Sequence, residues 1–174
     1  DMFHQYDPEV MKQLEEDENY IDSMADHVSN YLVQISATIT SHYHVEIMNY
    51  YFSAITEFER LGDHALNIAE IAAALHEKDS SFSQDALSEL NVLWQLLDTI
   101  LNHANEAFRK QNLAEARRIE PLEQVVDDMV SLLKDHHLKR LRDGECGVFN
   151  GSEFFNLLSE AERISDVCSN IGVA

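Results

Sequence analysis

The chain contains an internal repeat, and this repeat limits the possible folds more than any other feature. Residues 57–68 and 160–171 carry the same Glu, Glu, Arg, Asp, Asn and Ile at six of twelve positions, 103 residues apart. A second pair of similar segments, residues 18–24 and 123–129, is separated by 105 residues. Because the two separations nearly agree, we infer one duplication of a unit of roughly a hundred residues.

Helical periodicity extends over most of the chain. Apolar residues recur every three or four positions through five segments, and the 174 residues include only 5 Gly and 2 Pro. A fold rich in strands or loops would need more turn-forming residues. The predicted helices span residues 8–36, 41–77, 84–110, 113–141 and 153 onward. The sequence therefore predicts an all-α bundle.

Local signals mark several helix boundaries. Asp7 is a favourable cap and Pro8 a favourable first helical residue. Pro121 lies inside the fourth segment, so we expect that helix to kink or to begin late. Ser152 follows the loop 143–147 and is the expected cap of the last helix.

The repeat matches the first two predicted helices with the last two and leaves the helix at 84–110 without a counterpart. We therefore expect two three-helix units, residues 1–78 and 79–174, in which the first helix of unit one is missing. The chain begins at Asp1 rather than Met, which is typical of a fragment. A unit that lacks one helix should leave an apolar groove exposed.

The net charge argues against several kinds of partner. Lys and Arg number 12 and Asp and Glu number 32, for a net charge of −20. This excess repels nucleic acid and anionic lipid headgroups and favours metal cations or basic surfaces. No segment has about 20 continuous apolar residues, so we expect no direct insertion into lipid. Two cysteines are too few for a disulfide framework and fit a reduced, cytoplasmic setting.

Each repeated motif contains two acidic residues four positions apart. Residues at this spacing lie on one helix face, where like charges repel by roughly 0.2–0.5 kcal/mol per pair. A cation between two such pairs would reverse that effect, and all-oxygen sites suit Mg²⁺, Ca²⁺, Mn²⁺ and iron. The alternative is a solvated acidic face, because 32 acids make such pairs common by chance. The four pairs are Glu18/Asp22, Glu59/Asp63, Glu123/Asp127 and Glu162/Asp166.

Other residues of the repeated motif each have two interpretations. Arg60 and Arg163 either bind the acidic cluster or form surface ion pairs. Asn67 and Asn170, four residues after the motif aspartates, either coordinate a site or form hydrogen bonds between helices. Gly62 weakens a helix and indicates close helix packing or a ligand beside the backbone.

The sequence offers no candidate for nucleophilic catalysis. It has no Ser-His-Asp arrangement, no phosphate-binding glycine loop and no zinc-protease motif. No His follows a Glu by three positions, so the Glu-x-x-His pattern of di-iron bundles is absent. We expect the histidines to be surface or core residues, with His64, next to Asp63, as the exception.

The repeated motifs resemble those of the PhoU family. Residues 59–70 read Glu-Arg-Leu-Gly-Asp-His-Ala-Leu-Asn-Ile-Ala-Glu, close to the family signature Glu-Arg-Ile-Gly-Asp-His-Ala-x-Asn-Ile-Ala-Glu, and residues 162–171 resemble its second copy. The run 137–146, together with residues 168–171, is similar to the cytoplasmic PhoU-like domain of bacterial Na⁺/phosphate cotransporters. The resemblance implies a pair of antiparallel three-helix bundles that regulates phosphate uptake without catalysis.

The resemblance also implies metal on the acidic motifs: multinuclear iron or zinc, or Mg²⁺ or Mn²⁺. Val167 departs from the family pattern, which has His after the motif Asp. The implied partners are the transmembrane transport domain of the same polypeptide, at the cytoplasmic face of the cell membrane, and a second copy of the chain in a homo-oligomer. The implied ligands are Glu18, Asp22, Glu59 and Asp63 in unit one and Glu123, Asp127, Glu162 and Asp166 in unit two.

Three other functions are compatible with the sequence. The first is a free-standing PhoU regulator that acts on an ABC phosphate transporter and its sensor kinase. The second is a di-metal carboxylate enzyme, against which the absent Glu-x-x-His pattern argues. The third is an acidic helical scaffold without metal, which predicts that Asp63→Ala and Asp166→Ala leave stability unchanged or raise it slightly.

Overall fold

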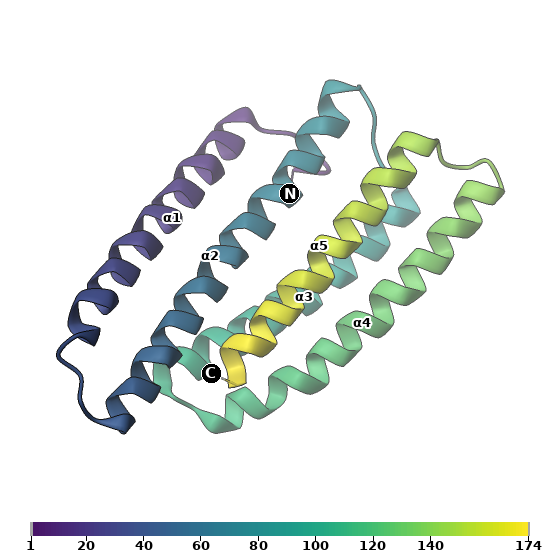
Figure 1. Ribbon diagram of the computed structural model, residues 1–174. Helices are drawn as coiled ribbons and strands as arrows, with labels where there is room; N and C mark the ends of the chain where they lie inside the picture. Colours follow the sequence, from purple (N-terminus) through teal and green to yellow (C-terminus); the bar gives the residue numbers. More distant parts are fainter. Residues whose placement is uncertain (1, 174) are drawn as a thin grey trace.

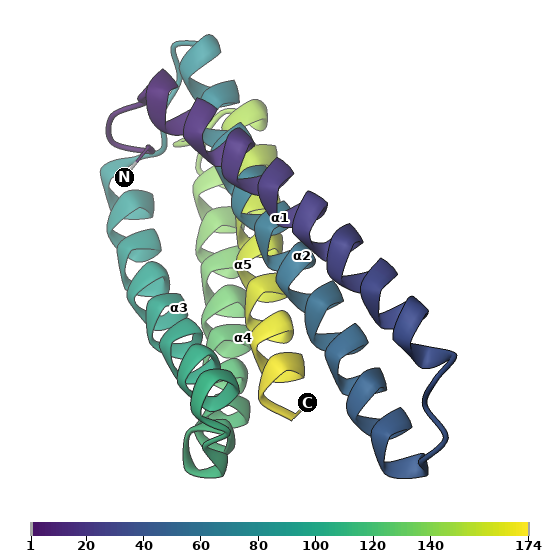
Figure 2. The same ribbon diagram turned by 90° about the vertical axis from the view of Figure 1, so that its left-hand side faces the viewer.

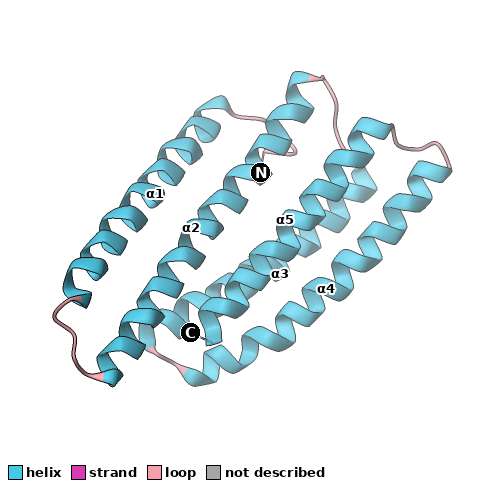
Figure 3. Cartoon of the chain, viewed as in Figure 1, coloured by secondary structure: helices cyan, strands magenta, loops and turns pink. Residues whose placement is uncertain are grey.

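The computed structural model describes residues 2–173 and consists of long α-helices connected by short loops (Figure 1). No strand occurs within these residues (Figure 3), so the all-α prediction is confirmed. None of the described helices is both long and apolar enough to cross a membrane. The helices are α1 (Pro8–Ser36), α2 (His42–Glu77), α3 (Gln84–Lys110), α4 (Leu113–Arg142) and α5 (Val148–Val173).

Side chains near the helix ends stabilise the boundaries that the sequence predicts. The Asp7 carboxylate accepts a hydrogen bond from the Glu9 N–H over 2.9 Å at the start of α1. The Asn112 side chain accepts a hydrogen bond from the Ala114 N–H over 3.0 Å at the start of α4. Gln111 ends α3 in the left-handed conformation, with φ of 51°. These contacts satisfy backbone groups that a helix end leaves without partners.

The helices form two groups that meet along α2 and α5. Helices α3, α4 and α5 pack against one another as a three-helix bundle, and α2 packs against α5. Within the described residues, α1 packs against α2 but against no other helix, and Figure 2 shows this pair leaning away from α3. The grouping agrees with the expected pairing of helices, while the division at residues 78 and 79 stays a prediction.

The hydrophobic core lies mainly in the three-helix bundle. Phe154, Leu157 and Leu158 of α5 are completely buried, and Leu93 and Ile100 of α3 face them in the same cluster. By contrast, the buried apolar residues of α1 are Ala25 and Leu32. Burial of a large apolar side chain contributes about 1.5–3 kcal/mol, so α3–α5 supply most of the apolar stabilisation.

The residues before α1 fold back over the end of the three-helix bundle. The Phe3 ring stacks on Phe82 and Trp94, with centroid distances of 5.8 and 6.3 Å. The Tyr6 ring stacks on His76 at 4.5 Å. These contacts connect the α1–α2 pair to α3 at a point where the helices themselves do not pack together.

The last helix begins earlier than the sequence predicts. Helix α5 starts at Val148, so Ser152 lies inside the helix and the expected start near residue 153 is wrong. The cause is a pair of long-range hydrogen bonds to Asn150: the Ser80 hydroxyl donates to Oδ1 over 2.6 Å, and Nδ2 donates to the Ser81 carbonyl over 2.8 Å. These contacts from the α2–α3 loop hold the first turn of α5.

Pro121 does not delay the start of α4. The helix begins at Leu113 and continues through Pro121 to Arg142, so the expected alternative of a late start is wrong. Proline removes the hydrogen bond from position 121 to the Arg117 carbonyl. Because Pro121 and Arg117 are both exposed, water can bind the freed carbonyl, which reduces the cost of continuing the helix.

An apolar groove lies between α1 and α2, as the sequence analysis predicts. The groove has a volume of about 190 Å³. Tyr20 is 67% exposed and Met24 44% exposed, so large apolar side chains on this face are open to solvent. The residues that line the groove are Tyr20, Ile21, Met24, Ala25, Val28, Ile55 and Phe58.

Candidate metal centre

Three of the four acidic residues predicted in unit one come together between α1 and α2. Glu18, Asp22 and Asp63 each offer a carboxylate oxygen, and these oxygens lie within 4.8 Å of one another. The pKa of Glu18 is raised by desolvation and then by the charges of Asp22 and Asp63. Glu59 is half-buried on α2 and is not part of this group.

The four acidic residues of unit two, on α4 and α5, raise one another's pKa values, but among the described residues no three of their carboxylate oxygens lie within 4.8 Å of one another. Burial raises the pKa of Asp127, and the charges of Glu162 and Asp166 raise it further. Burial also raises the pKa of Glu123 and of Asp166, with added repulsion from Asp127 on Glu123 and from Glu162 on Asp166. The cluster therefore accumulates negative charge that its surroundings only partly compensate.

One carboxylate oxygen of this cluster has no partner. Asp127 Oδ1 is buried and accepts no hydrogen bond. A buried, unpaired carboxylate oxygen is unfavourable, and a bound cation would supply the missing positive charge. The convergent carboxylates of unit one fit a hard divalent cation, which prefers several oxygen ligands, whereas unit two offers one unpaired oxygen.

Between the two acidic groups, α2 and α5 are joined by a set of reciprocal contacts, which we call the clasp: Glu57, His64, Asn67, Glu160 and Asn170. Asn67 of α2 donates a hydrogen bond to Glu160 of α5 over 3.1 Å, and Asn170 of α5 donates to Glu57 of α2 over 3.2 Å. Because each repeated Glu meets the Asn of the other copy, the two motif helices cross with approximate two-fold symmetry. The asparagines therefore act in helix packing, one of their two expected roles.

The symmetry of the clasp is broken at one position. His64 Nδ1 donates a hydrogen bond to Glu160 Oε2 over 2.7 Å, whereas the corresponding residue of α5 is Val167, which carries no donor. His64, the histidine that the sequence analysis singles out, thus contacts a clasp glutamate, and His103 and His136 also contact glutamates.

The motif arginines bind the clasp glutamates of their own helices. Arg60 Nη1 lies 3.1 Å from Glu57 Oε1, and Arg163 Nη1 lies 2.9 Å from Glu160 Oε1. Both arginines are more than half exposed, so each ion pair contributes little by itself. In the part of the chain that the structure describes, neither arginine forms an ion pair with a predicted metal ligand.

Gly62 is explained by close helix packing. A Cβ atom at this position would lie 3.3 Å from Ile21 Cδ1 of α1, which is tighter than most real contacts. The small residue thus brings α2 close to α1, beside the Glu18, Asp22 and Asp63 group.

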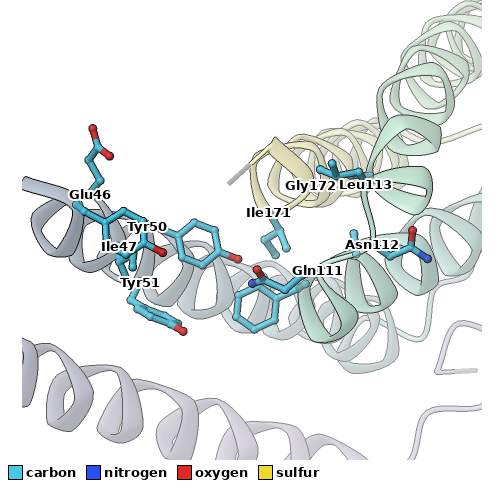
Figure 4. Close-up of a pocket in the computed structure, with 13 residues that line it drawn as sticks. Glu46, Ile47, Tyr50, Tyr51, Gln111, Asn112, Leu113, Ile171 and Gly172 are labelled. Atoms are coloured by element: carbon cyan, nitrogen blue, oxygen red, sulfur yellow. The ribbon is translucent and has the colours of Figure 1, made fainter.

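A separate cleft of about 460 Å³ lies at the far end of α5 (Figure 4). Tyr50 and Tyr51 line it from α2, Asn112 and Leu113 from the start of α4, and Ile171 from α5. It contains none of the predicted metal ligands and borders the last described residues, so we assign it no function.

A charge-removing substitution in unit two tests the raised carboxyl pKa values. With a chelator present, Asp127→Asn should be more stable than wild type at pH 7 by roughly 0.2–0.5 kcal/mol, because it removes like-charge repulsion. The pKa of Asp127 is raised above 3.8 on folding, so ionisation opposes folding and the repulsion disappears as pH falls through the raised pKa. The stability difference should therefore shrink between pH 7 and pH 4 in thermal unfolding.

The exposed Asp135 of the same helix gives the matched control, Asp135→Asn. Because Asp135 is exposed, this variant should differ from wild type in stability at pH 7 by less than Asp127→Asn does. An Asp127→Asn protein that is less stable than wild type at pH 7 would contradict the electrostatic account.

The fold and its acidic groups define a class of protein: a duplicated helical domain whose repeated motif helices carry carboxylate clusters. The PhoU domain matches residues 1–72 and 90–173. The chain belongs to the PhoU family.

Two curated relatives carry the name phosphate-specific transport system accessory protein PhoU homolog. One, from Streptococcus pneumoniae serotype 4, is 25% identical over 119 residues, which cover 68% of this chain and 54% of the relative. The other, homolog 1 from Thermotoga maritima, is 25% identical over 115 residues, which cover 66% of this chain and 49% of the relative. The chain thus spans about half the length of these relatives.

Solved structures show the same fold. The crystal structure of PhoU from Pseudomonas aeruginosa matches with a TM-score of 0.90 at 18% identity, covering 99% of this chain and 82% of that one. The phosphate transport system regulatory protein PhoU from Streptococcus pneumoniae matches with a TM-score of 0.80 at 18% identity, covering 94% and 76%.

Proposed function

We propose that the chain is a regulatory, non-catalytic domain that controls phosphate uptake as an accessory to a phosphate-specific transport system. The observation that carries this proposal is the match of the PhoU domain to both halves of the chain. The names of the relatives describe accessory proteins, which supports the free-standing regulator better than a domain of a Na⁺/phosphate cotransporter. Its partners would then be an ABC phosphate transporter and a sensor kinase.

Metal binding is the second part of the proposal. Glu18, Asp22 and Asp63 would hold a cation between α1 and α2, with Glu59 as a more distant member. Glu123, Asp127, Glu162 and Asp166 would hold a cation between α4 and α5. A hard cation would neutralise the carboxylate repulsion and cross-link each helix pair, thereby fixing the surface that a transporter contacts. Iron, zinc, Mg²⁺ and Mn²⁺ all remain candidates.

The cotransporter domain remains a second candidate, because residues 137–146 and 168–171 resemble that branch of the family. In that case the partner is a transport domain in the same polypeptide, and the chain lies at the cytoplasmic face of the membrane. The gene region that encodes the protein before Asp1 distinguishes the two forms: spanning segments there favour the cotransporter. Self-association into a homo-oligomer is compatible with both.

The test of the regulatory role is phosphate uptake in a bacterium that lacks its own PhoU protein. Cells that express the chain should take up radiolabelled phosphate at a rate closer to that of the parent strain. The Asp63→Ala/Asp166→Ala variant, expressed at the same level, should restore less. An uptake rate unaffected by the chain, with both proteins present and folded, would contradict the accessory role in this transport system.

A further inference from the structure

A buried polar cluster lies at the end of the three-helix bundle where α4 turns back into α5. His137 of α4 is 1% exposed, and its ring nitrogen Nε2 lies 3.9 Å from the thiol sulfur of Cys146 in the α4–α5 loop. The other ring nitrogen, Nδ1, and the Nε and Nη2 atoms of Arg140 are buried and have no hydrogen-bond partner among the described residues. Because unpartnered polar groups in a core are unfavourable, stability alone does not explain this cluster.

The other copy of the repeat has apolar residues at these positions. Leu32 and Ile35 of α1 lie 105 positions before His137 and Arg140, the same separation that relates residues 18–24 to residues 123–129. Leu32 is 7% exposed, so the position of His137 is buried in both copies, and a leucine fills it in α1. A titratable ring at this buried position is therefore a feature of α4 that α1 does not share.

The surroundings of His137 disfavour a positive charge on its ring. The ring stacks on Phe154 of α5 at a centroid distance of 4.4 Å, and the guanidinium carbon of Arg140 lies 5.3 Å from the centroid of the same Phe154 ring. Protonation would thus place a second cation near Arg140 in a buried site. Burial lowers the pKa of His137, and the charge of Arg140 lowers it further.

The one carboxylate that raises the pKa of His137, Glu89 of α3, is paired with other groups. Its Oε2 lies 2.9 Å from Arg140 Nη1, and its Oε1 lies 2.8 Å from His136 Nδ1. The Cys146 thiol stays protonated and neutral, because burial raises its pKa, and α5 contributes aromatic rings to the site. A protonated His137 would therefore lack a carboxylate of its own.

We propose that His137 is an acid-sensitive switch: protonation of its ring loosens the end of the bundle where α4 turns back into α5. The protonated ring carries an N–H on both nitrogens, and the contact at hand is the weakly accepting sulfur of Cys146. Opening of this end hydrates the charged ring at the expense of its stacking on Phe154. The switch responds to protons and does not depend on the proposed metal binding.

Denaturant unfolding of the full chain in EDTA tests the proposal with His137→Leu, which introduces the residue that α1 has at this position. Because folding lowers the pKa of His137, its neutral ring supports the fold fully above about pH 6.5, and this contribution is lost as pH falls below that value. The folding equilibrium constant of the variant, divided by that of wild type, should therefore increase about five- to tenfold between pH 7.5 and pH 5.5. Carboxylates titrate in both proteins and cancel in this ratio.

Two further variants complete the unfolding test. His137→Gln, which keeps a neutral polar side chain of similar size, should show the same trend with pH even where leucine disturbs the packing. His42→Gln removes a side chain that is 89% exposed, so its ratio to wild type should change much less. A His137 ratio that is independent of pH, or a change for His42→Gln as large as that for His137→Leu, would overturn the switch.

Hydrogen exchange of backbone amides tests whether the opening is local. At pH 5.5, residues 152–158 of wild type should exchange several-fold faster than the same residues of His137→Leu. After correction for intrinsic rates, they should also exchange faster than the amides of α3 around the buried Leu93. Equal protection of these two regions in wild type would overturn the local opening.

Discussion

Replacing Glu160 with leucine is expected to lower the free energy of unfolding by about 3 kcal/mol. The side chain of Glu160 is 10% exposed and accepts hydrogen bonds from both His64 and Asn67 of α2. Leucine would leave these two donors unsatisfied at the interface of α2 and α5, at roughly 1–3 kcal/mol for each buried partner. Chemical denaturation followed by circular dichroism measures the loss.

Glu57→Leu is the matched control, because Glu57 is about as buried as Glu160 but its hydrogen-bond partners are more exposed to solvent. Asn170 and Arg60 are both exposed and can be hydrated when Glu57 is removed, so we expect a loss of only about 1 kcal/mol. In a double-mutant cycle, Glu160→Leu combined with His64→Val should show a coupling of at least 0.5 kcal/mol. Equal losses from the two glutamates, without coupling, would contradict the assigned asymmetry of the clasp.

Replacing Phe154 with alanine should lower the free energy of unfolding by about 3–5 kcal/mol, the largest effect we expect from a single apolar residue. Phe154 is completely buried at the centre of the three-helix bundle. Its ring stacks on His137 at 4.4 Å and meets Phe82 edge to face at 5.3 Å. Alanine would leave a cavity that these rings can close only in part.

Phe58→Ala provides the comparison for Phe154→Ala. Phe58 is 36% exposed and lies in the apolar groove between α1 and α2, so its removal should cost clearly less than that of Phe154. Denaturant unfolding of both variants checks the ranking. A larger loss for Phe58 would contradict the placement of the core in α3–α5.

The sequence was sufficient to predict the helices, because their boundaries depend on local chemistry. Asp7, Pro8 and Asn112 act within one helical turn, and the predicted starts of α1 and α4 are correct. The start of α5 depends instead on Asn150, whose partners are about seventy residues away in the α2–α3 loop. Local capping rules favour Ser152 because they contain no information about that loop.

The candidate site was predictable to a lesser extent. Acidic spacing and repetition identified Glu18, Asp22 and Asp63, which the structure brings together, since residues four apart share a helix face. The ligand set as a whole stays a prediction. The spacing could not show that Asp63, and not Glu59, would lie beside Glu18 and Asp22. Which of the two lies there depends on the angle at which α1 crosses α2. The role of Glu160 depends on contacts between helices, and no pattern within one helix reveals it.

The clasp shows why the repeated Asn and Arg residues had open interpretations. Matching residues in two copies indicate a shared role, but the sequence cannot state whether the role is a ligand or a packing contact. The structure places Asn67 and Asn170 across the α2–α5 interface, where each meets the glutamate of the other copy. The asparagines therefore join the two halves of the chain.

Elemental analysis tests most directly whether the acidic motifs of this PhoU-family chain bind metal, as we propose. Wild type and the Asp63→Ala/Asp166→Ala variant should be purified without a His tag and reconstituted separately with iron, zinc and manganese. We predict that wild type retains at least one equivalent of metal and that the variant loses it while remaining folded. Wild type without metal under all three conditions, or a variant that retains as much metal as wild type, would contradict the account.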